Sequence, residues 1–392
     1  MKRIPIRRFA AGLIGIVLLA SGLLKIADPV GTMLIVKEYL KFFHIGSLIP
    51  AAKGIGIALS LFEALTGIAL ITGVLRKITA WVTTLLLAFF TLVTLVLWIK
   101  NPQMDCGCFG QAIHLTHTQS LVKNVVLLLL ALWAFLPFGD FGKTPVRKIV
   151  SASIAAVSVI YAVVYCNTHL PLVDYTDFRI GAELMASLDD DIVADNHYRE
   201  ERTYAKDGKT GKFLPGFYPG EGWSLIKKDT VFVESGLSAE HFPILSFRDA
   251  VDQYCDRMAA EGKVVIFSLY EPSEVSWERI LAGYDAVSEA GGTPIVMLAC
   301  APSQVSGYGV PAGIPVYFAD YKSLISLNRD NGGATYLSEG EIIRKWSVKD
   351  TPKDFGPAFR DDPVNLSTWI LSRSRLKAQG FCLYLAALLV LV

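Results

Sequence analysis

Long apolar stretches fill most of the first 168 residues, and they set the predicted architecture of this part of the chain. A helix that crosses a bilayer core needs about 20 mostly apolar residues, because its backbone polar groups must be hydrogen-bonded within the segment. Five stretches meet this condition and are predicted to be transmembrane helices: Phe9–Ile26, Ile55–Leu75, Ile78–Ile99, Leu121–Phe138 and Ile149–Tyr165. A signal peptide is the alternative for the first, since basic residues precede it, but four more spans follow.

Beyond about residue 243, short apolar runs alternate with polar turns, which is typical of an α/β domain. The runs predict three buried strands: Lys263–Leu269, Thr293–Ala301 and Ile314–Ala319. Between and around them the helical pattern predicts three helices: Asp249–Ala260, Ser273–Glu289 and Tyr321–Asn328. A terminal hairpin is expected from Ala334–Leu337 and Glu341–Trp346, turned by Ser338-Glu-Gly340. This order of elements resembles the thioredoxin fold.

A working thioredoxin carries Cys-x-x-Cys directly after the first long strand, at the beginning of the next helix, where the helix dipole stabilises a thiolate. Here that place holds Glu271-Pro-Ser-Glu-Val-Ser276, which contains no nucleophile. The resemblance therefore implies a redox-inactive thioredoxin-like domain that is better suited to holding a partner than to reducing one.

The patterns divide the chain into four segments. Residues 1–168 form a five-helix transmembrane domain, 169–242 a connecting segment of turns and hairpins, 243–350 the thioredoxin-like domain, and 351–392 a C-terminal tail. The tail ends in the apolar run Gly380–Val392, whose 13 residues are too few for an ordinary span. We expect a surface-seeking or frayed tail, and the alternative is a sixth span.

Composition supports a membrane domain joined to a water-exposed one. The whole chain is 52% hydrophobic and only 19% charged, which argues against an ordinary cytosolic enzyme. Residues 1–168 hold 15 Lys and Arg against 5 Asp and Glu, whereas the remainder holds 22 against 31, so the halves carry +10 and −9. The basic residues flank apolar runs and form no patch interleaved with aromatic residues, so nucleic acid is excluded as a partner.

The distribution of Lys and Arg predicts the orientation in the membrane. The N-terminus, the short loop with Arg76 and Lys77, and the loop with Lys143, Arg147 and Lys148 are the basic side. This side is expected to be cytoplasmic, so the residues after about 168 lie outside. In a bacterium this places the protein in the inner (cell) membrane, with the second half in the periplasm, where disulfides persist.

Glu63 lies near the middle of the second predicted span, where a charge costs about 2.5–3.5 kcal/mol on insertion scales. Helical spacing puts it on one face with Gly56, Ser60 and Gly67, and small residues let a neighbouring helix approach closely. Glu63 is a candidate catalytic residue, as a proton-handling or ligand-binding acid; the alternative is a packing hydrogen bond. Lys25 is expected to extend to the membrane surface and not to pair with Glu63.

Two cysteines separated by one glycine occupy the outer loop after the third span, in Met104-Asp-Cys-Gly-Cys-Phe-Gly110. A bridge across one residue closes a tight ring, and strained bridges are the more easily reduced ones, so Cys106 and Cys108 are candidates for thiol–disulfide exchange. Cys166, at the outer end of the fifth span, is a candidate resolving thiol. Two alternatives remain: an inert pair of loop cysteines, and a metal site formed by Cys106, Cys108, His114 and His117.

These residues carry a family resemblance over about the first 140 residues. The run Ser21-Gly-Leu-Leu-Lys25 with Asp28-Pro29 and Glu38-Tyr39, the mid-span Glu63, and the Asp105-Cys-Gly-Cys-Phe-Gly110 loop resemble the DoxX-like/MauE family. The resemblance implies a four-helix membrane core, to which the fifth helix is added, and, for the methylamine-utilisation members, a role in maturing a disulfide-rich periplasmic enzyme. Quinone is a cofactor by family analogy only; the residues themselves identify none.

The predicted function is periplasmic thiol–disulfide or electron transfer through the Cys-x-Cys loop, as a component of a thiol–disulfide oxidoreductase. The alternative is a non-catalytic membrane scaffold or maturation factor that recruits a periplasmic protein partner through the thioredoxin-like domain. Transport of a small solute or metal is a third hypothesis, supported only by the five spans and the mid-span acid.

Overall fold

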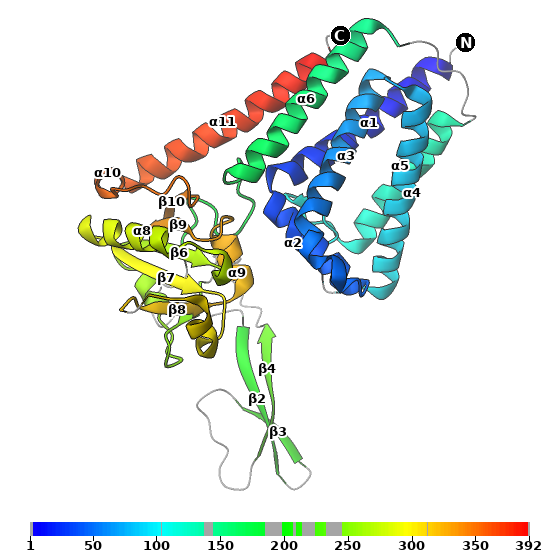
Figure 1. The fold of residues 1–392 in the computed structure, drawn as a ribbon. Helices are drawn as coiled ribbons and strands as arrows, with labels where there is room; N and C mark the ends of the chain where they lie inside the picture. The colour runs from blue at the N-terminus through cyan, green and yellow to red at the C-terminus, as the bar shows by residue number, and fades with distance from the viewer. Residues whose placement is uncertain are drawn as a thin grey trace.

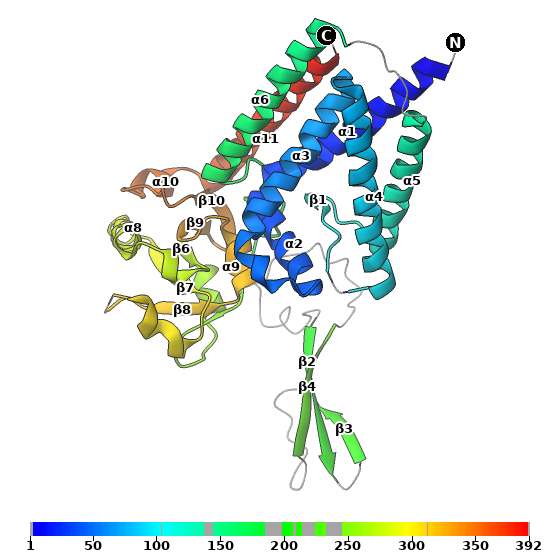
Figure 2. The same ribbon diagram turned by 45° about the vertical axis from the view of Figure 1, so that its right-hand side comes forward.

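The structure is a computed structural model that describes residues 3–102, 104–136, 144–184, 198–206, 209–213, 224–232, 245–311 and 313–390. A bundle of long helices forms one part, an α/β domain lies beside one end of it, and a final long helix runs back along the bundle (Figure 1). Both ends of the described chain lie at the end of the bundle that is remote from the α/β domain (Figures 1 and 2).

Six α-helices and one short 3₁₀ helix make up the helical bundle: α1 (Arg3–Ala27), α2 (Pro29–Phe42), η1 (Gly46–Ala51), α3 (Ala52–Thr72), α4 (Arg76–Lys100), α5 (His117–Phe135) and α6 (Val146–Thr168). Within the described residues, five helices are long and apolar enough to cross a membrane: α1, α3 together with η1, α4, α5 and α6. The five predicted apolar helices are therefore confirmed. The predicted end of the fourth, Phe138, lies outside the described residues.

Helices α1 and α3 pack with their backbones almost in contact. A Cβ atom added to Gly22 would lie 2.7 Å from the Ser60 carbonyl oxygen, and one added to Gly67 would lie 2.6 Å from the Gly15 carbonyl oxygen. Gly56, Ser60, Glu63 and Gly67 are all buried, as the predicted small-residue face of this helix requires. Close backbone approach through small residues is a common way for membrane helices to associate.

Helix α2 is an element that the apolar pattern did not predict. Asp28 caps its N-terminus by accepting a hydrogen bond from the Gly31 N–H at 2.9 Å, and Pro29 occupies the first helical position. An Asp-Pro pair is a helix-start signal that was available in the sequence. The helix is too short to span a bilayer, and Val30, Met33 and Leu34 pack instead against the α/β domain.

The α/β domain is built around a six-stranded mixed sheet in the order β10-β9-β6-β7-β8-β5. Its strands are β5 (Phe247–Arg248), β6 (Lys263–Leu269), β7 (Thr293–Leu298), β8 (Val316–Ala319), β9 (Gly333–Ser338) and β10 (Glu341–Trp346). Neighbours among β6, β7 and β8 are parallel, and the other pairings are antiparallel. Its helical elements are η3 (Asp256–Ala259), η4 (Pro272–Glu274), α8 (Trp277–Glu289), η5 (Pro302–Tyr308), α9 (Tyr321–Leu327) and α10 (Gly356–Arg360).

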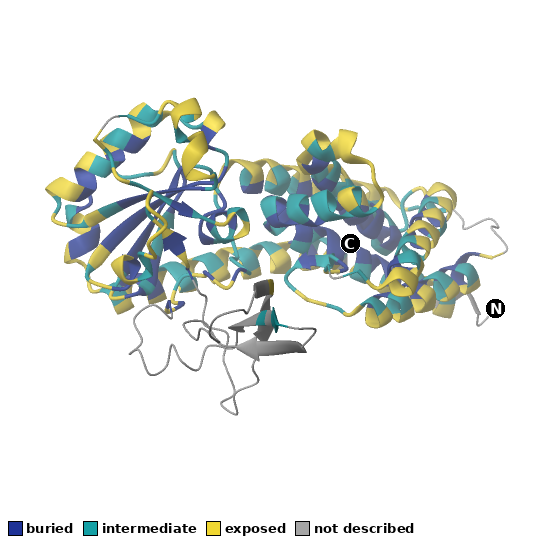
Figure 3. Cartoon of the chain, turned by 90° about the horizontal axis from the view of Figure 1, so that it is seen from below, coloured by how far each residue is buried: buried dark blue, intermediate teal, exposed yellow. Residues whose placement is uncertain are grey.

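The central strands are buried on both faces, which is why they appear as continuous apolar runs (Figure 3). One core cluster covers the face with α8 and α10. The other lies under α9, with the segment Phe178–Leu184 and the side chains from α2. The bundle and the sheet therefore share a core through α2.

Most predicted elements of this domain are present, including the hairpin, whose turn residues Glu339 and Gly340 have φ values of 47° and 82°. The helix predicted over Asp249–Ala260 is wrong. The Asp249 carboxylate accepts hydrogen bonds from the Val251 and Gln253 N–H groups, both at 2.9 Å. This side-chain turn competes with helix formation, and only the short η3 remains.

The final helix, α11 (Pro363–Val390), corrects the expectation of a frayed tail. Leu366 packs under the sheet, whereas Leu385 is 1% exposed and packs against α6. The Ser151 hydroxyl donates to the Leu388 carbonyl, and the Ser158 and Tyr384 hydroxyls lie 3.2 Å apart. The apolar end of α11 thus runs antiparallel to α6 along its length (Figure 1). Residues 391–392 lie outside the described residues.

A separate antiparallel sheet of β3-β2-β4 order comes from the connecting segment (Figure 2). Its strands are β2 (Tyr198–Lys206), β3 (Lys209–Phe213) and β4 (Ser224–Phe232). Residues 185–197, 207–208, 214–223 and 233–244 lie outside the described residues, and so do the turns and hairpins predicted there.

Candidate functional site

The two candidate cysteines lie in Met104–Gln111, here called the thiol loop, which precedes α5. Its second half is the short strand β1 (Cys108–Gln111), which packs against α1 and α2. Gly107, between the cysteines, has φ 59°, and a side chain there would overlap the Cγ2 of Ile35 on α2. Glycine at this position is therefore required both by the backbone conformation and by the close contact with α2.

Cys106 is buried, with 4% of its surface exposed, and its Sγ lies 2.8 Å from His117 Nδ1. The other ring nitrogen, His117 Nε2, lies 2.9 Å from the Pro102 carbonyl oxygen. A carbonyl can only accept, so Nε2 is the protonated nitrogen and Nδ1 is the one able to accept the thiol proton. Burial raises the pKa of Cys106, so the resting thiol keeps its proton with a base in direct contact.

Cys106 and Cys108 both line a cavity of about 260 Å³, here called the thiol cavity, but only Cys108 is partly exposed. Its walls are mostly apolar side chains from α1, α2, α3, α4 and α5. The polar and charged groups among them include Lys25, Tyr39, Lys123 and Asn124. The Lys123 ammonium lies 4.6 Å from the centre of the Phe109 ring. Cys108 is therefore the more accessible of the two thiols.

Glu63 is completely buried, and Lys25 pairs with it: Lys25 Nζ lies 2.6 Å from Glu63 Oε1. The expectation that Lys25 extends to the membrane surface is wrong. Lys25 lies near the end of α1, but only 7% of it is exposed, and its ammonium lies 5.7 Å from the centre of the Phe90 ring. An unpaired Glu63 charge in this apolar setting would cost more than bending the lysine chain inward.

Ser21 connects Glu63 to the thiol loop. Its Oγ lies 2.6 Å from Glu63 Oε2 and 2.7 Å from the Cys108 carbonyl oxygen. One hydroxyl has one proton, while a carboxylate and a carbonyl both accept. Ser21 is the donor in both contacts, so its single proton is shared between the Glu63 carboxylate and the Cys108 carbonyl.

Tyr39 on α2 holds the other cysteine: its hydroxyl donates to the Cys106 carbonyl at 2.6 Å. Burial raises the pKa of Tyr39, so it remains a donor. Ser21 and Tyr39 appear in the sequence only as parts of the family-like runs, and no periodic pattern identifies their contacts with the loop. The sequence marks His117 only as a possible metal ligand, whereas in the structure it is a partner of Cys106.

The four predicted metal ligands do not come together. Cys106 and His117 are in contact, but His114 is exposed and lies 3.2 Å from Asp105. Within the described part of the chain, no group of three or more His, Cys, Asp and Glu side chains is arranged to hold a metal ion.

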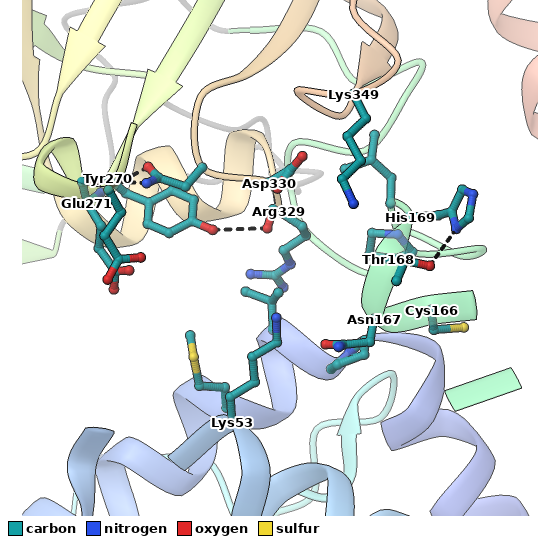
Figure 4. Close-up of a pocket in the computed structure, with 17 residues that line it drawn as sticks. Lys53, Cys166, Asn167, Thr168, His169, Tyr270, Glu271, Arg329, Asp330 and Lys349 are labelled. Atoms are coloured by element: carbon teal, nitrogen blue, oxygen red, sulfur yellow. Dashed lines mark hydrogen bonds between the residues drawn. The ribbon is translucent and has the colours of Figure 1, made fainter. Parts of the chain in front are cut away.

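Cys166 is buried at the end of α6, in the wall of a different pocket. This interdomain pocket, of about 350 Å³, lies between the bundle and the α/β domain and is also lined by Tyr270, Glu271 and Arg329 (Figure 4). The thiol loop does not line it. All six cysteines of the chain are described, and all six are free thiols.

Similarity to known proteins was found only for the helical bundle. No curated protein and no solved structure is significantly similar to the chain. The model of the family described as "Methylamine utilisation protein MauE" matches residues 4–137, which hold α1 to α5 and the thiol loop. The N-terminal third of this chain is therefore similar to the MauE family of membrane proteins.

Proposed function

We propose that the protein is a thiol–disulfide exchange component of the bacterial inner membrane, with Cys106 and Cys108 as the exchange pair at the periplasmic side. The observation that carries this proposal is the contact between the buried Cys106 and His117 Nδ1, with the partly exposed Cys108 two residues away on the same cavity. One thiol has a base to take its proton, and the other can be reached. A two-step exchange needs both: an accessible sulfur that a partner thiolate can attack, and a second sulfur whose proton a neighbouring base can take up or return.

In the proposed reaction, a thiolate of a periplasmic protein dithiol attacks Cys108 Sγ in the oxidised loop. The Cys106–Cys108 bond breaks, and Cys106 leaves as a thiolate that takes up a proton through His117. The second partner thiol, on losing its proton, attacks the partner sulfur of the mixed disulfide and displaces Cys108. The partner thus loses two electrons and two protons and becomes a disulfide, while the loop becomes a dithiol.

Glu63 is proposed to position the Cys108 backbone from inside the bundle. Ser21 bridges the Glu63 carboxylate and the Cys108 carbonyl at 2.6 and 2.7 Å, and Lys25 balances the charge of Glu63. The carboxyl would therefore tune the position and polarity of the Cys108 backbone from inside the bundle.

Reoxidation of the loop needs a two-electron, two-proton acceptor, and a membrane quinone would supply that chemistry if bound in the thiol cavity. The residues fit such a group: the walls are largely apolar, and Cys108 and Lys123 line the same space of about 260 Å³. The chain's own part is to exclude water from the dithiol and to place a cation beside the ligand.

The α/β domain is proposed to be thioredoxin-like, because its β6-β7 parallel pair is flanked by an antiparallel β9-β10 hairpin and α8 follows β6. The segment Glu271–Ser276 after β6 contains no cysteine. This favours the second candidate function, in which the domain recruits or stabilises a periplasmic protein without reacting with it.

Trapping of mixed disulfides in cells tests the proposal. In Cys106→Ser, Cys108 can still attack the disulfide of an oxidised partner, but the thiol that would re-form the loop bridge and release the partner is gone. A mixed disulfide with a protein partner should therefore accumulate on non-reducing gels. Cys108→Ser should trap far less, because Cys106 is buried, and Cys300→Ser serves as a control outside the loop.

The redox function fails if Cys106→Ser captures nothing and the double serine variant keeps the wild-type cellular function. A periplasmic protein that still co-purifies with the double serine variant would support the scaffold function instead.

A further inference from the structure

Arg329 is a buried cation of the α/β domain that reaches into the helical bundle. It follows α9, and its side chain is 3% exposed. Arg329 Nη2 lies 2.8 Å from Asp28 Oδ2 and also donates to the side-chain oxygen of Gln111. Figure 4 shows the side chain extending from the α/β domain toward the bundle. One guanidinium therefore joins three segments that are far apart in the sequence.

The two bundle residues that Arg329 binds belong to the two elements next to the thiol cysteines. Asp28 caps α2, and α2 carries Tyr39, which holds the Cys106 carbonyl at 2.6 Å. Gln111 ends β1, which begins at Cys108. Arg329 thus contacts both the start of α2, which holds Cys106 through Tyr39, and the end of β1, which begins at Cys108.

The neighbourhood of this cluster leaves no room for another side chain. A Cβ atom added to Gly31 would overlap Asp28 Oδ2 and would lie 3.0 Å from Gln111 Cδ. Arg329 Nη1 also donates to the Ile325 carbonyl at 3.2 Å, which orients the guanidinium. By contrast, another interdomain ion pair, Lys322–Glu38 at 3.0 Å, is largely exposed and contributes little.

We propose that Arg329 is a positioning residue through which docking of the α/β domain holds the thiol loop and controls access to Cys106 and Cys108. A partner that moves the α/β domain away from the bundle breaks the Arg329 contacts and exposes the loop. Removing one member of a buried ion pair leaves an uncompensated charge, so the docked state depends strongly on this cluster. The physiological meaning rests on the proposed exchange function, whereas the effect on thiol access does not.

Thiol modification of the full-length reduced protein in detergent micelles tests this inference. The uncharged reagent N-ethylmaleimide is added, and the modification rate of each cysteine is followed by peptide mass spectrometry. Arg329→Gln removes the cation, and Gly31→Ala disrupts the same cluster without changing any charge. Lys322→Ala is the matched control, because it removes an exposed interdomain contact that does not touch the loop.

Arg329→Gln and Gly31→Ala should each raise the modification rate of Cys106 by at least about tenfold, because local opening then exposes a buried thiol. Lys322→Ala should leave it within about twofold. Cys255, on the α/β domain, reports whether that domain remains folded, and its rate should not change. The inference is overturned if either variant has the wild-type modification rate at Cys106 while the modification rate of Cys255 shows that the α/β domain is folded.

If Arg329→Gln does not fold, Gly31→Ala alone decides the result. Failure of the exchange function would appear as absence of mixed disulfides with these modification rates intact, so the two proposals fail separately.

Discussion

The ion pair between Lys25 and Glu63 gives the sharpest test of how the bundle is held together. The two charges are 2.6 Å apart and almost completely buried. At an effective dielectric constant of about 20, two unit charges at this distance attract by about 6 kcal/mol. Removing both from water costs several kcal/mol per ion, so the pair as a whole is close to neutral for stability. Breaking it from one side is expensive, because the remaining charge stays buried.

The perturbation is a double-mutant cycle with Lys25→Met, Glu63→Gln and the double variant. Each single change is expected to lower the free energy of unfolding by about 3 kcal/mol, and the double variant by only about 1 kcal/mol. The coupling energy is then about 5 kcal/mol, well above the additivity error of about 0.5 kcal/mol.

The assay is reversible unfolding in mixed micelles with increasing denaturing detergent, followed by circular dichroism. Lys100→Met is the control, because Lys100 is exposed at the end of α4, and a change of less than about 0.5 kcal/mol is expected. If the effects of the two single variants simply add, Lys25 does not depend on Glu63 and the pairing argument is refuted.

Three further predictions follow from particular contacts. Gly22→Ala should destabilise the bundle by about 1–3 kcal/mol in the same assay because its Cβ would lie 2.7 Å from the α3 backbone, whereas Gly12→Ala, with nothing within 4 Å, should be neutral or slightly stabilising. Cys382, on the part of α11 beside α6, should resist a membrane-impermeant maleimide in intact cells if that part is embedded in the membrane; rapid labelling from the periplasmic side would contradict this. Burial raises the pKa of Asp174, but the charge and hydrogen bond of Lys345 outweigh it and hold the pKa below its ordinary value. The stabilisation by ionised Asp174 is therefore complete above about pH 4 and is lost as the pH falls further. Asp174→Asn should remove this pH dependence, so the melting temperature of the variant should fall less between about pH 5 and pH 2 than that of the wild type.

The positions of most elements could be predicted from the sequence because they depend on local periodicity. Lys263–Leu269 is predicted to be a strand because most of its seven residues are β-branched, aromatic or aliphatic. Such a run can be buried on both faces of a sheet. The turn at Glu339–Gly340 and the five apolar spans are local signals of the same kind. The sequence does not predict helix α11 as one continuous element, because Arg373, Arg375 and Lys377 interrupt its apolar pattern.

The candidate site could be predicted only in part. Cys106, Cys108 and Glu63 are marked by residue type and by their place in the chain. Their partners are not marked, because Ser21, Tyr39 and His117 become neighbours only when helices meet at particular rotations. Helical spacing predicts which residues share a face, but it does not say which face of another helix will oppose it.

The sequence alone determined that this protein is a cationic set of membrane-length helices followed by an acidic α/β domain, since hydropathy and charge act residue by residue. The tertiary structure decided which charges neutralise one another. Lys25 turns inward to Glu63, and Arg329 crosses between the two parts to Asp28, 301 residues away in the chain. These choices depend on burial, because an unpaired charge is tolerated in water and is costly away from it, and burial exists only once the helices and the sheet have packed.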